Sequence, residues 1–268
     1  MGGEPASGGT PAMGGEPAMG GEPAMGGAMP LPEPELIPCN ADSEVGEFDE
    51  CPTNIYSLKT NDEITDETLV GVTGIVTGHR MGAMENVSHL IIQVDREDPD
   101  YAGPRFSGIW IFLNTAPDEI KNNPPSDGQV IHIVGEPEDY YGKRQLNRVS
   151  HLTVIRDGVM PPPVNTDPEN LVTDGNHAWP YEGVLVEVRN VVVTEVEPEP
   201  AGGEEAPTNE FRVNVGGRAG AGVRVDDWLH QYDPVPAVNT AFSAIRGILT
   251  YTRNNSKILV RSAEDMVE

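Results

Sequence analysis

The sequence is short of cysteine, of basic residues and of long apolar runs. Only 2 of its 268 residues are cysteines, and 17 lysines and arginines stand against 43 aspartates and glutamates, which gives a formal net charge of −26. A chain of this charge repels phosphate backbones and anionic membranes at long range. No apolar run approaches the ~18 residues of a transmembrane helix, so we expect no membrane-spanning segment.

Sequence motifs for catalysis are also missing. The six histidines are scattered, with no HExxH motif or other close pair of metal ligands. No G-x-S-x-G elbow marks a nucleophile, and "GGRAGAG" at residues 216–222 lacks the G-K-[ST] ending of a phosphate-binding loop. We therefore expect a protein that is not an enzyme and that uses no cofactor.

The two cysteines, Cys39 and Cys51, enclose an acidic segment that reads "CNADSEVGEFDEC". Their spacing predicts one disulfide and an oxidising compartment, with two free thiols as the alternative. Calcium takes six to eight oxygen ligands around a tight turn, and the acids here surround a glycine. A solvated acidic loop is the main interpretation, and a calcium site is the alternative. The calcium candidates are Asp42, Glu44, Asp49 and Glu50.

The chain begins with a degenerate hexapeptide repeat, as in "GGEPAMGGEPAM". Glycine gives the backbone no preference, proline blocks helix and sheet, and no apolar face recurs to offset the entropy of ordering. Residues 1–36 are therefore predicted to be a disordered spacer. Residues 37–64 follow as the acidic segment closed by the disulfide.

Alternating apolar and polar residues predict two sets of five strands, over residues 65–158 and 179–268. A segment rich in proline and turn residues, 159–178, separates them as a linker. In both sets three strands precede a connector, and two strands joined by a hairpin follow it. This order fits the five-stranded Greek-key barrel known as the OB-fold. The expected fold class is all-β, with two tandem OB-like barrels behind a disordered tail; two β-sandwiches are the alternative.

The hairpin between the last two strands of the first set reads "VGEPEDYYGKRQL". In an OB-fold this loop frames the ligand groove, and aromatic rings beside cations are typical of sites for single-stranded nucleic acid. The alternative is structural, because a Tyr-Gly pair also suits a tight turn. The candidate ligand-binding residues are Tyr140, Tyr141, Lys143 and Arg144, with Arg105 and Trp110 nearby. Trp110 faces either the core or the surface, depending on the strand register.

Residues 128–146, "GQVIHIVGEPEDYYGKRQL", resemble the end of OB-like domains attached to secreted bacterial endonuclease/exonuclease/phosphatase-type nucleases. The earlier stretches "VGVTGIVTG", "LIIQVD" and "GIWIF" fit the opening of that domain. The second half, with "FSAIRGILTYTRNNSKILVRSAEDM", is similar to repeats in surface lipoproteins of delta-type proteobacteria. The resemblance covers about residues 65–155 and 180–266, and it implies OB-like domains outside the cytoplasm. The catalytic nuclease domain has no counterpart in this chain.

Together these features predict a non-enzymatic, extracytoplasmic binding or scaffold protein that its spacer tethers to a cell surface. We expect its export signal to lie outside this sequence. A cell-surface protein or glycan is the expected partner. One alternative is a single-stranded nucleic-acid-binding accessory module of a secreted nuclease system. A calcium-dependent adhesion module is another. The sequence does not indicate an oligomeric state.

Overall fold

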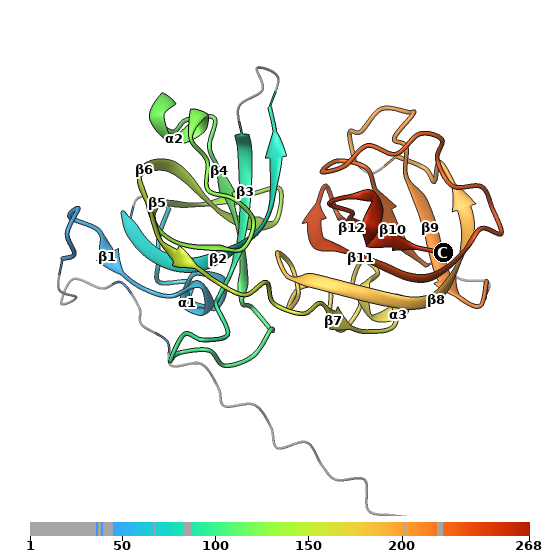
Figure 1. The fold of residues 1–268 in the computed structure, drawn as a ribbon, viewed down its shortest axis with the longest axis horizontal. Helices are drawn as coiled ribbons and strands as arrows, with labels where there is room; N and C mark the ends of the chain where they lie inside the picture. Colours follow the sequence, from blue (N-terminus) through green and yellow to red (C-terminus); the bar gives the residue numbers. More distant parts are fainter. Residues whose placement is uncertain are drawn as a thin grey trace, which may run out of the picture. The chain divides into compact units, whose positions relative to one another are not determined.

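The computed structural model describes Leu36, Cys39 and residues 45–66, 68–82, 87–200, 202–218 and 222–268. Apart from Leu36, the predicted disordered spacer therefore lies outside the described residues. The described chain consists mostly of strands joined by loops and a few short helices (Figure 1). Within these ranges no helix is both long enough and apolar enough to cross a membrane.

The first barrel is closed by five strands. They are β2 (Val70–Met81), β3 (Val87–Gln93), β4 (Gly108–Phe112), β5 (Gln129–Tyr140) and β6 (Lys143–Asp157). The strands pair in the order β2-β3-β4-β6-β5, and β5 pairs again with β2 to close the barrel. The pairing of β4 with β6 is parallel and the others are antiparallel. α2 (Asp118–Asn122) connects β4 to β5, as in the predicted OB-like order.

Residues before the first barrel join its sheet and its core. β1 (Cys51–Pro52) pairs in parallel with the start of β2, and α1 (Ile55–Thr60) follows directly (Figure 1). Ile55, Tyr56 and Leu58 of this helix are buried in the same apolar cluster as the strand residues. Burying a large apolar side chain contributes about 1.5–3 kcal/mol. Helix α1 therefore contributes to the stability of the first barrel.

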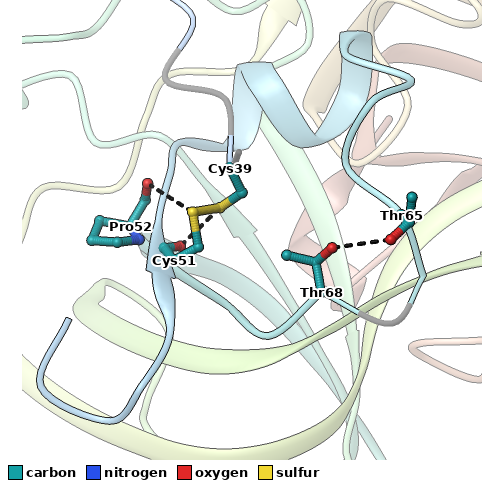
Figure 2. Close-up of a disulfide and its surroundings, with 5 residues drawn as sticks. All are labelled: Cys39, Cys51, Pro52, Thr65 and Thr68. Carbon is teal, nitrogen blue, oxygen red and sulfur yellow. Dashed lines mark hydrogen bonds between the residues drawn. A yellow bond between two sulfur atoms is a disulfide. The ribbon is translucent and has the colours of Figure 1, made fainter. Parts of the chain in front are cut away.

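The predicted disulfide between Cys39 and Cys51 is confirmed. Their Cα atoms are 5.5 Å apart, within the usual range for such a bond. Figure 2 shows the bond at the start of β1, near a hydrogen bond between the hydroxyls of Thr65 and Thr68. Closing a loop of this length stabilises a fold by about 3 kcal/mol, mainly by constraining the unfolded chain. A structural disulfide fits a non-reducing environment.

The second barrel repeats the topology of the first. Its strands are β8 (Leu185–Val196), β9 (Phe211–Val215), β10 (Val223–Asp226), β11 (Ala241–Thr252) and β12 (Asn255–Leu259). β10 and β12 are parallel, and β11 returns to β8 to close the barrel. Both units are thus closed five-stranded barrels, and the predicted fold class is confirmed.

Short elements flank the second barrel. β7 (Val164–Asn165) pairs in parallel with β8, and α3 (Pro168–Leu171) follows it with Leu171 buried in the second core. The linker segment 159–178 thus contributes a strand and a core residue. At the other end, η1 (Ala263–Asp265) leads into β13 (Met266–Val267), which pairs with β11.

The fourth strand of each barrel carries a glycine at an equivalent place. A Cβ on Gly135 of β5 would lie 2.8 Å from the carbonyl oxygen of Asn147. One on Gly247 of β11 would lie 2.4 Å from the carbonyl oxygen of Leu259. In both barrels the backbone of the fifth strand therefore approaches too closely for any side chain.

The two barrels belong to one compact unit, and they contact each other through polar and apolar residues. Lys59 and Glu182 form an ion pair in which both side chains are fully buried. The backbone N–H of Leu185 donates to Gln93 Oε1 at 2.8 Å. An apolar cluster with residues from both barrels lies beside these contacts; it consists of Ile91, Trp110, Leu185, Ile248 and Leu259. The barrels therefore share an interface with a buried ion pair, a buried hydrogen bond and an apolar cluster.

Strand register places Trp110 in this shared cluster. Its neighbours Ile109 and Ile111 point into the core of the first barrel, so Trp110 points out of that barrel. It is nevertheless 1% exposed, because the second barrel covers it. Neither a core nor a surface position describes this residue, since it lies between the barrels.

Candidate functional site

The hairpin that joins β5 to β6 is a two-residue turn at Tyr141 and Gly142. Tyr140 and Lys143 lie opposite one another in the ladder, and the turn residues have φ angles of 49° and 83°. Positive φ at both positions is typical of the tight turns that match strand twist, and it favours glycine. Gly142 therefore suits the turn, whereas Tyr141 takes a backbone conformation that a bulky residue rarely adopts.

The hairpin between β11 and β12 has the same turn and contacts the first one. Its turn residues, Arg253 and Asn254, have φ angles of 51° and 63°. The Arg253 guanidinium lies 5.3 Å from the centroid of the Tyr141 ring. A Cβ on Gly142 would lie 2.9 Å from the ring of Tyr251. Corresponding hairpins of the two barrels thus meet tip to tip.

These hairpins help to form a cleft of about 390 Å³ between the barrels. The first barrel contributes residues of β2 to β6, on the face and hairpin that bind ligands in OB-folds. The second barrel contributes residues of β10, β11 and β12 and the loop after β10. The aromatic rings in the walls are His89, Trp110, Phe112, Tyr140 and Trp228. The cations in the walls are Arg80, Lys143, Arg253 and Lys257.

Two tryptophans and a histidine form an aromatic cluster in the cleft wall. The ring centroids of Trp110 and Trp228 are 5.6 Å apart, at an interplanar angle of 62°. His89 meets Trp228 edge to face at 5.0 Å. The Arg80 guanidinium lies 3.8 Å from the Trp228 centroid, which is close enough for a cation–π interaction. Trp228 comes from the second barrel and the other three from the first, so the cluster joins them.

Lys143 is a buried cation without a carboxylate partner. It is 5% exposed, and its Nζ lies 4.2 Å from the Trp110 centroid and 5.8 Å from the Tyr140 centroid. Among the residues that the structure describes, none makes a hydrogen bond or an ion pair with this ammonium group. Burial lowers the pKa of Lys143 to about 8, although the charges of Glu182 and Glu138 oppose the shift. Aromatic faces therefore provide the closest stabilisation of the charge.

His89 lies close enough to two cations of the cleft wall, Lys143 and Arg80, to be affected by their charges. Burial lowers the pKa of His89 to about 3, and the charges of Lys143 and Arg80 lower it further. The imidazole is therefore neutral near pH 7 and offers one donor and one acceptor nitrogen. Its neutral state follows mainly from burial, and the two nearby cations add to the effect.

In the wall from the second barrel, a buried cluster around Lys257 is neutralised by its own carboxylates. Lys257 Nζ donates to Glu204 at 2.7 Å and to Asp226 at 3.1 Å, and it also pairs with Glu210. Glu210 in turn accepts from Arg224 at 2.7 Å. Burial raises the pKa of Asp226 to about 6 against the opposing charge of Lys257. Lys257 therefore has its counter-charges without a ligand.

The wall from the first barrel holds buried polar atoms without partners. Trp110 and Gln145 are paired across β4 and β6. In the described structure, Trp110 Nε1 and Gln145 Oε1 have no hydrogen-bond partner. The Gln145 amide nitrogen donates to Glu138 at 2.8 Å, and that of Asn147 donates to the same carboxylate oxygen at 3.0 Å. An unpaired buried donor or acceptor costs about 1–3 kcal/mol. Both atoms have almost no accessible surface, so a ligand in the cleft reaches neither of them unless the side chains move.

Among the candidate ligand-binding residues, the structure brings Tyr140, Lys143 and Trp110 together in this cleft. Tyr141 is next to them but occupies the turn, where it is 58% exposed. The Tyr141 ring contacts Tyr140 edge to face at 4.7 Å. It does not line the cleft.

The other two candidates lie elsewhere. Arg144 follows Lys143 in β6 and therefore points to the opposite side of the strand. It pairs with Asp66 at 2.9 Å and Asp139 at 3.3 Å. Arg105 is exposed before β4, with its guanidinium 6.0 Å from the Phe106 ring. Neither arginine lines the cleft.

Sequence reasoning missed Arg80, His89, Arg253 and Trp228. Arg80 and His89 are directly opposite in the β2–β3 ladder, on the face that also carries Trp110. Side-chain alternation along β3 and β2 places both residues on the same face as Trp110, so the strand pattern could have identified them. Trp228 follows β10 and comes from the second barrel, so local pattern gives no sign that it reaches this cleft.

The calcium candidates are only partly described. Asp42 and Glu44 lie outside the described residues. Glu50 is 4% exposed; its carboxylate accepts from the Phe48 N–H at 2.6 Å and lies 3.6 Å from His132. Within the described ranges, no three acidic, histidine or cysteine side chains form a group suited to a metal ion. The calcium site remains a prediction.

Comparisons with known proteins were made for sequence and for structure. No family model matches the chain, and no curated protein matches it. Among solved structures, a putative aspartyl-tRNA synthetase from Leishmania major Friedlin is similar with a TM-score of 0.30 and 9% sequence identity. The match covers 47% of this chain and 24% of that protein. A similarity this distant gives no information about function, so the site must be interpreted from its own chemistry.

Proposed function

We propose that this protein is a non-enzymatic, extracytoplasmic binding protein whose cleft holds a glycan of a cell surface. The observation that carries the proposal is the cleft, which combines aromatic rings, polar side chains and an ammonium without a carboxylate partner in about 390 Å³. Protein sites for small polar ligands have this size and this mixture of groups. The disulfide supports an extracytoplasmic location, because such bonds persist in oxidising compartments.

A sugar ring suits the groups that the cleft offers. Sugars present C–H faces that pack on aromatic rings, and their hydroxyls both donate and accept hydrogen bonds. Tyr140, which is 44% exposed in the cleft wall, offers a ring for such packing. Asn147 and Thr252, both partly exposed in the cleft wall, offer an amide and a hydroxyl. The cleft and a sugar therefore match, because each combines apolar surface with groups that form hydrogen bonds.

Tryptophan fluorescence provides a direct test. Two of the three tryptophans, Trp110 and Trp228, line the cleft, and Trp179 does not. A Trp179→Phe background therefore limits the emission to the cleft. We expect short neutral, acetylated or acidic oligosaccharides to change this emission saturably. Absence of a saturable change with every class of sugar would contradict the proposal.

Two neighbouring tyrosines supply a matched pair of variants. Tyr140 lines the cleft, whereas Tyr141 occupies the exposed turn beside it. Tyr140→Ala should weaken sugar binding by about tenfold, which corresponds to about 1.4 kcal/mol. Tyr141→Ala should weaken binding less, since its ring lies outside the cleft and acts only through its contacts with Tyr140 and Arg253. Equal effects of both variants would indicate a general disturbance of the hairpin.

Single-stranded nucleic acid is the second candidate, and one observation favours it. The cleft lies on the OB face that binds oligonucleotides in other proteins, and Arg80 and Lys143 are available there. Against it stands the net charge of −26. The test is fluorescence anisotropy of a labelled oligothymidine at 50 and 200 mM salt. Binding that falls steeply with salt and depends on Tyr140 would favour nucleic acid over a glycan.

A further inference from the structure

Basic residues in this acidic chain are mostly paired with carboxylates. All 17 lysines and arginines lie in the described ranges, and there the basic side chains without an ion pair are Arg80, Arg96, Arg105, Lys143 and Arg253. Arg96 and Arg105 are exposed, so water solvates their charges. The other three, Arg80, Lys143 and Arg253, line the same cleft. Cations without counter-charges are therefore concentrated in one place.

These three cations, which we call the cleft cations, are shielded from water to different degrees. Lys143 is buried, and Arg80 and Arg253 are half-buried. Burial lowers the pKa of Arg80 although Asp226 and Asp227 oppose the shift. Arg253 donates one long hydrogen bond, 3.4 Å, to the carbonyl oxygen of Gly202. Removing a cation from water without a counter-charge is costly, and an anionic ligand group would offset that cost.

The cleft cations have different surroundings from the lysine in the opposite wall. Lys257 is equally shielded, but three carboxylates contact it. Glu182 and Glu138 act on Lys143 only through longer-range electrostatic attraction, without a direct contact. Glu182 is already paired with Lys59, and Glu138 accepts from two amide groups. Neither acid supplies a direct counter-charge to Lys143.

We propose that the cleft binds an acidic sugar, a hydroxylated ring with a single carboxylate, and that the cleft cations bind this carboxylate. The inference rests on the glycan-binding function proposed above and specifies the charge of the sugar. Charge-assisted hydrogen bonds are about twice as strong as neutral ones, so the carboxylate dominates the affinity. The ring hydroxyls have the partly exposed carboxylate of Glu138 as an acceptor in the wall.

A single carboxylate suits the cleft better than a polyanion does. Glu138, Glu204 and Asp226 are also in the walls, and they repel any further negative group. The protein as a whole carries a charge of −26, which opposes the approach of a chain with a phosphate at every unit. The volume of about 390 Å³ is near the small end of the ~300–1,000 Å³ typical of ligand pockets. One or two sugar rings fill such a space.

The test compares methyl glucuronide with methyl glucoside, which differ only in a carboxylate against a hydroxymethyl group. Both are titrated by tryptophan fluorescence into the full chain carrying Trp179→Phe. We expect the glucuronide to bind at least about tenfold more tightly. Lys143→Met keeps the apolar stem on Trp110 and removes the charge, and it should abolish the preference. Arg253→Gln at the turn is the second variant, with a smaller loss of preference expected.

Arg96→Gln is the matched control, because it removes an exposed arginine without an ion pair that lies outside the cleft. Equal binding of the two sugars, unchanged by Lys143→Met, would overturn the acidic-sugar inference and leave the glycan function standing. Absence of binding by either sugar, or by any neutral oligosaccharide, would overturn both. Tighter binding of thymidine monophosphate or an oligothymidine than of the glucuronide would overturn the inference in favour of nucleic acid. Thermal unfolding of each variant verifies that it is folded.

Discussion

At the scale of single residues, the cleft is unusual in burying a lysine against rings instead of carboxylates. The cation–π contact of Lys143 with Trp110 contributes about 0.5–2 kcal/mol. That is less than the cost of desolvating an ammonium, which is several kcal/mol. The position is therefore maintained by the surrounding fold, and the ligand carboxylate proposed above would offset the remaining cost.

The neutral state of His89 in the folded protein has a measurable consequence for stability. Its pKa is about 3 in the folded protein against 6.5 for a free imidazole. Between these values the unfolded chain binds a proton that the folded chain does not. The stability that a neutral His89 contributes is therefore complete above pH 6.5 and is lost as the pH falls towards 3. Asp226, whose pKa is raised to about 6, changes stability in the opposite direction over part of this range.

We expect His89→Gln to flatten the pH dependence of stability. From pH 7 to pH 4.5 the parent should lose more free energy of unfolding than the variant does, because only the parent must keep an imidazole unprotonated. Urea unfolding at several pH values measures the difference, and the contribution of Asp226 is common to both proteins. His230→Gln controls for the loss of a histidine. Parallel curves for parent and His89→Gln would show that the histidine is not held neutral by folding.

At the scale of elements, β4 shows how one strand serves two layers. Ile109 and Ile111 fill the first barrel, while Trp110 between them packs against the second. The alternation of side chains along a strand makes this division unavoidable once both faces are covered. The same rule divides Lys143, in the cleft, from Arg144, which pairs with Asp66 on the other side.

The glycine in each fourth strand sets how closely the fifth strand can approach. Gly247→Ala would place a Cβ 2.4 Å from the Leu259 carbonyl oxygen, which is backbone and cannot rotate away. We expect a loss of about 1–3 kcal/mol in the free energy of unfolding. Gly202→Ala is the control, since its nearest neighbour is at 3.5 Å and the change should stay within about 0.5 kcal/mol. Chemical denaturation distinguishes the two, and equal small effects would mean that β11 shifts at little cost.

At the scale of the whole molecule, the interface between the barrels contains a complete ion pair. Lys59 precedes the first barrel and Glu182 the second, and neither side chain is exposed. A buried pair is weak evidence for net stability, but loss of one member leaves an uncompensated charge. The charge of Glu182 also opposes the lowering of the Lys143 pKa that burial causes. The interface and the cleft are therefore electrostatically linked.

Glu182→Gln should therefore destabilise the protein strongly, by about 3–5 kcal/mol. The double variant Lys59→Met with Glu182→Leu should recover most of this loss, because it replaces both charges by apolar groups of similar size. Differential scanning calorimetry of the three proteins provides the comparison. If the double variant were as unstable as Glu182→Gln, lost packing would explain the effect better than the unpaired charge does.

The sequence contained enough information for the barrels but only for part of the cleft. Period-two patterning and the turn chemistry of Tyr141 and Gly142 are local, so the strands and the hairpin could be predicted. Trp110 could be assigned to the side opposite Ile109, but not to a partner, because the second barrel covers it from residues more than 70 positions away. Arg144 was included with Lys143 because composition alone ignores strand alternation. Trp228 could not be predicted either, because it reaches the cleft only through the packing of the second barrel against the first.

The location of the cleft has a practical consequence for handling this chain. A cut within residues 159–178, or expression of either half alone, would give fragments that each retain five strands. The first fragment would expose Ile91 and Trp110 to water, and the second would expose Ile248 and Leu259. Such fragments are prone to stick to one another or to other surfaces. A negative binding result obtained with either half would therefore not apply to the intact protein, because neither half contains the whole cleft.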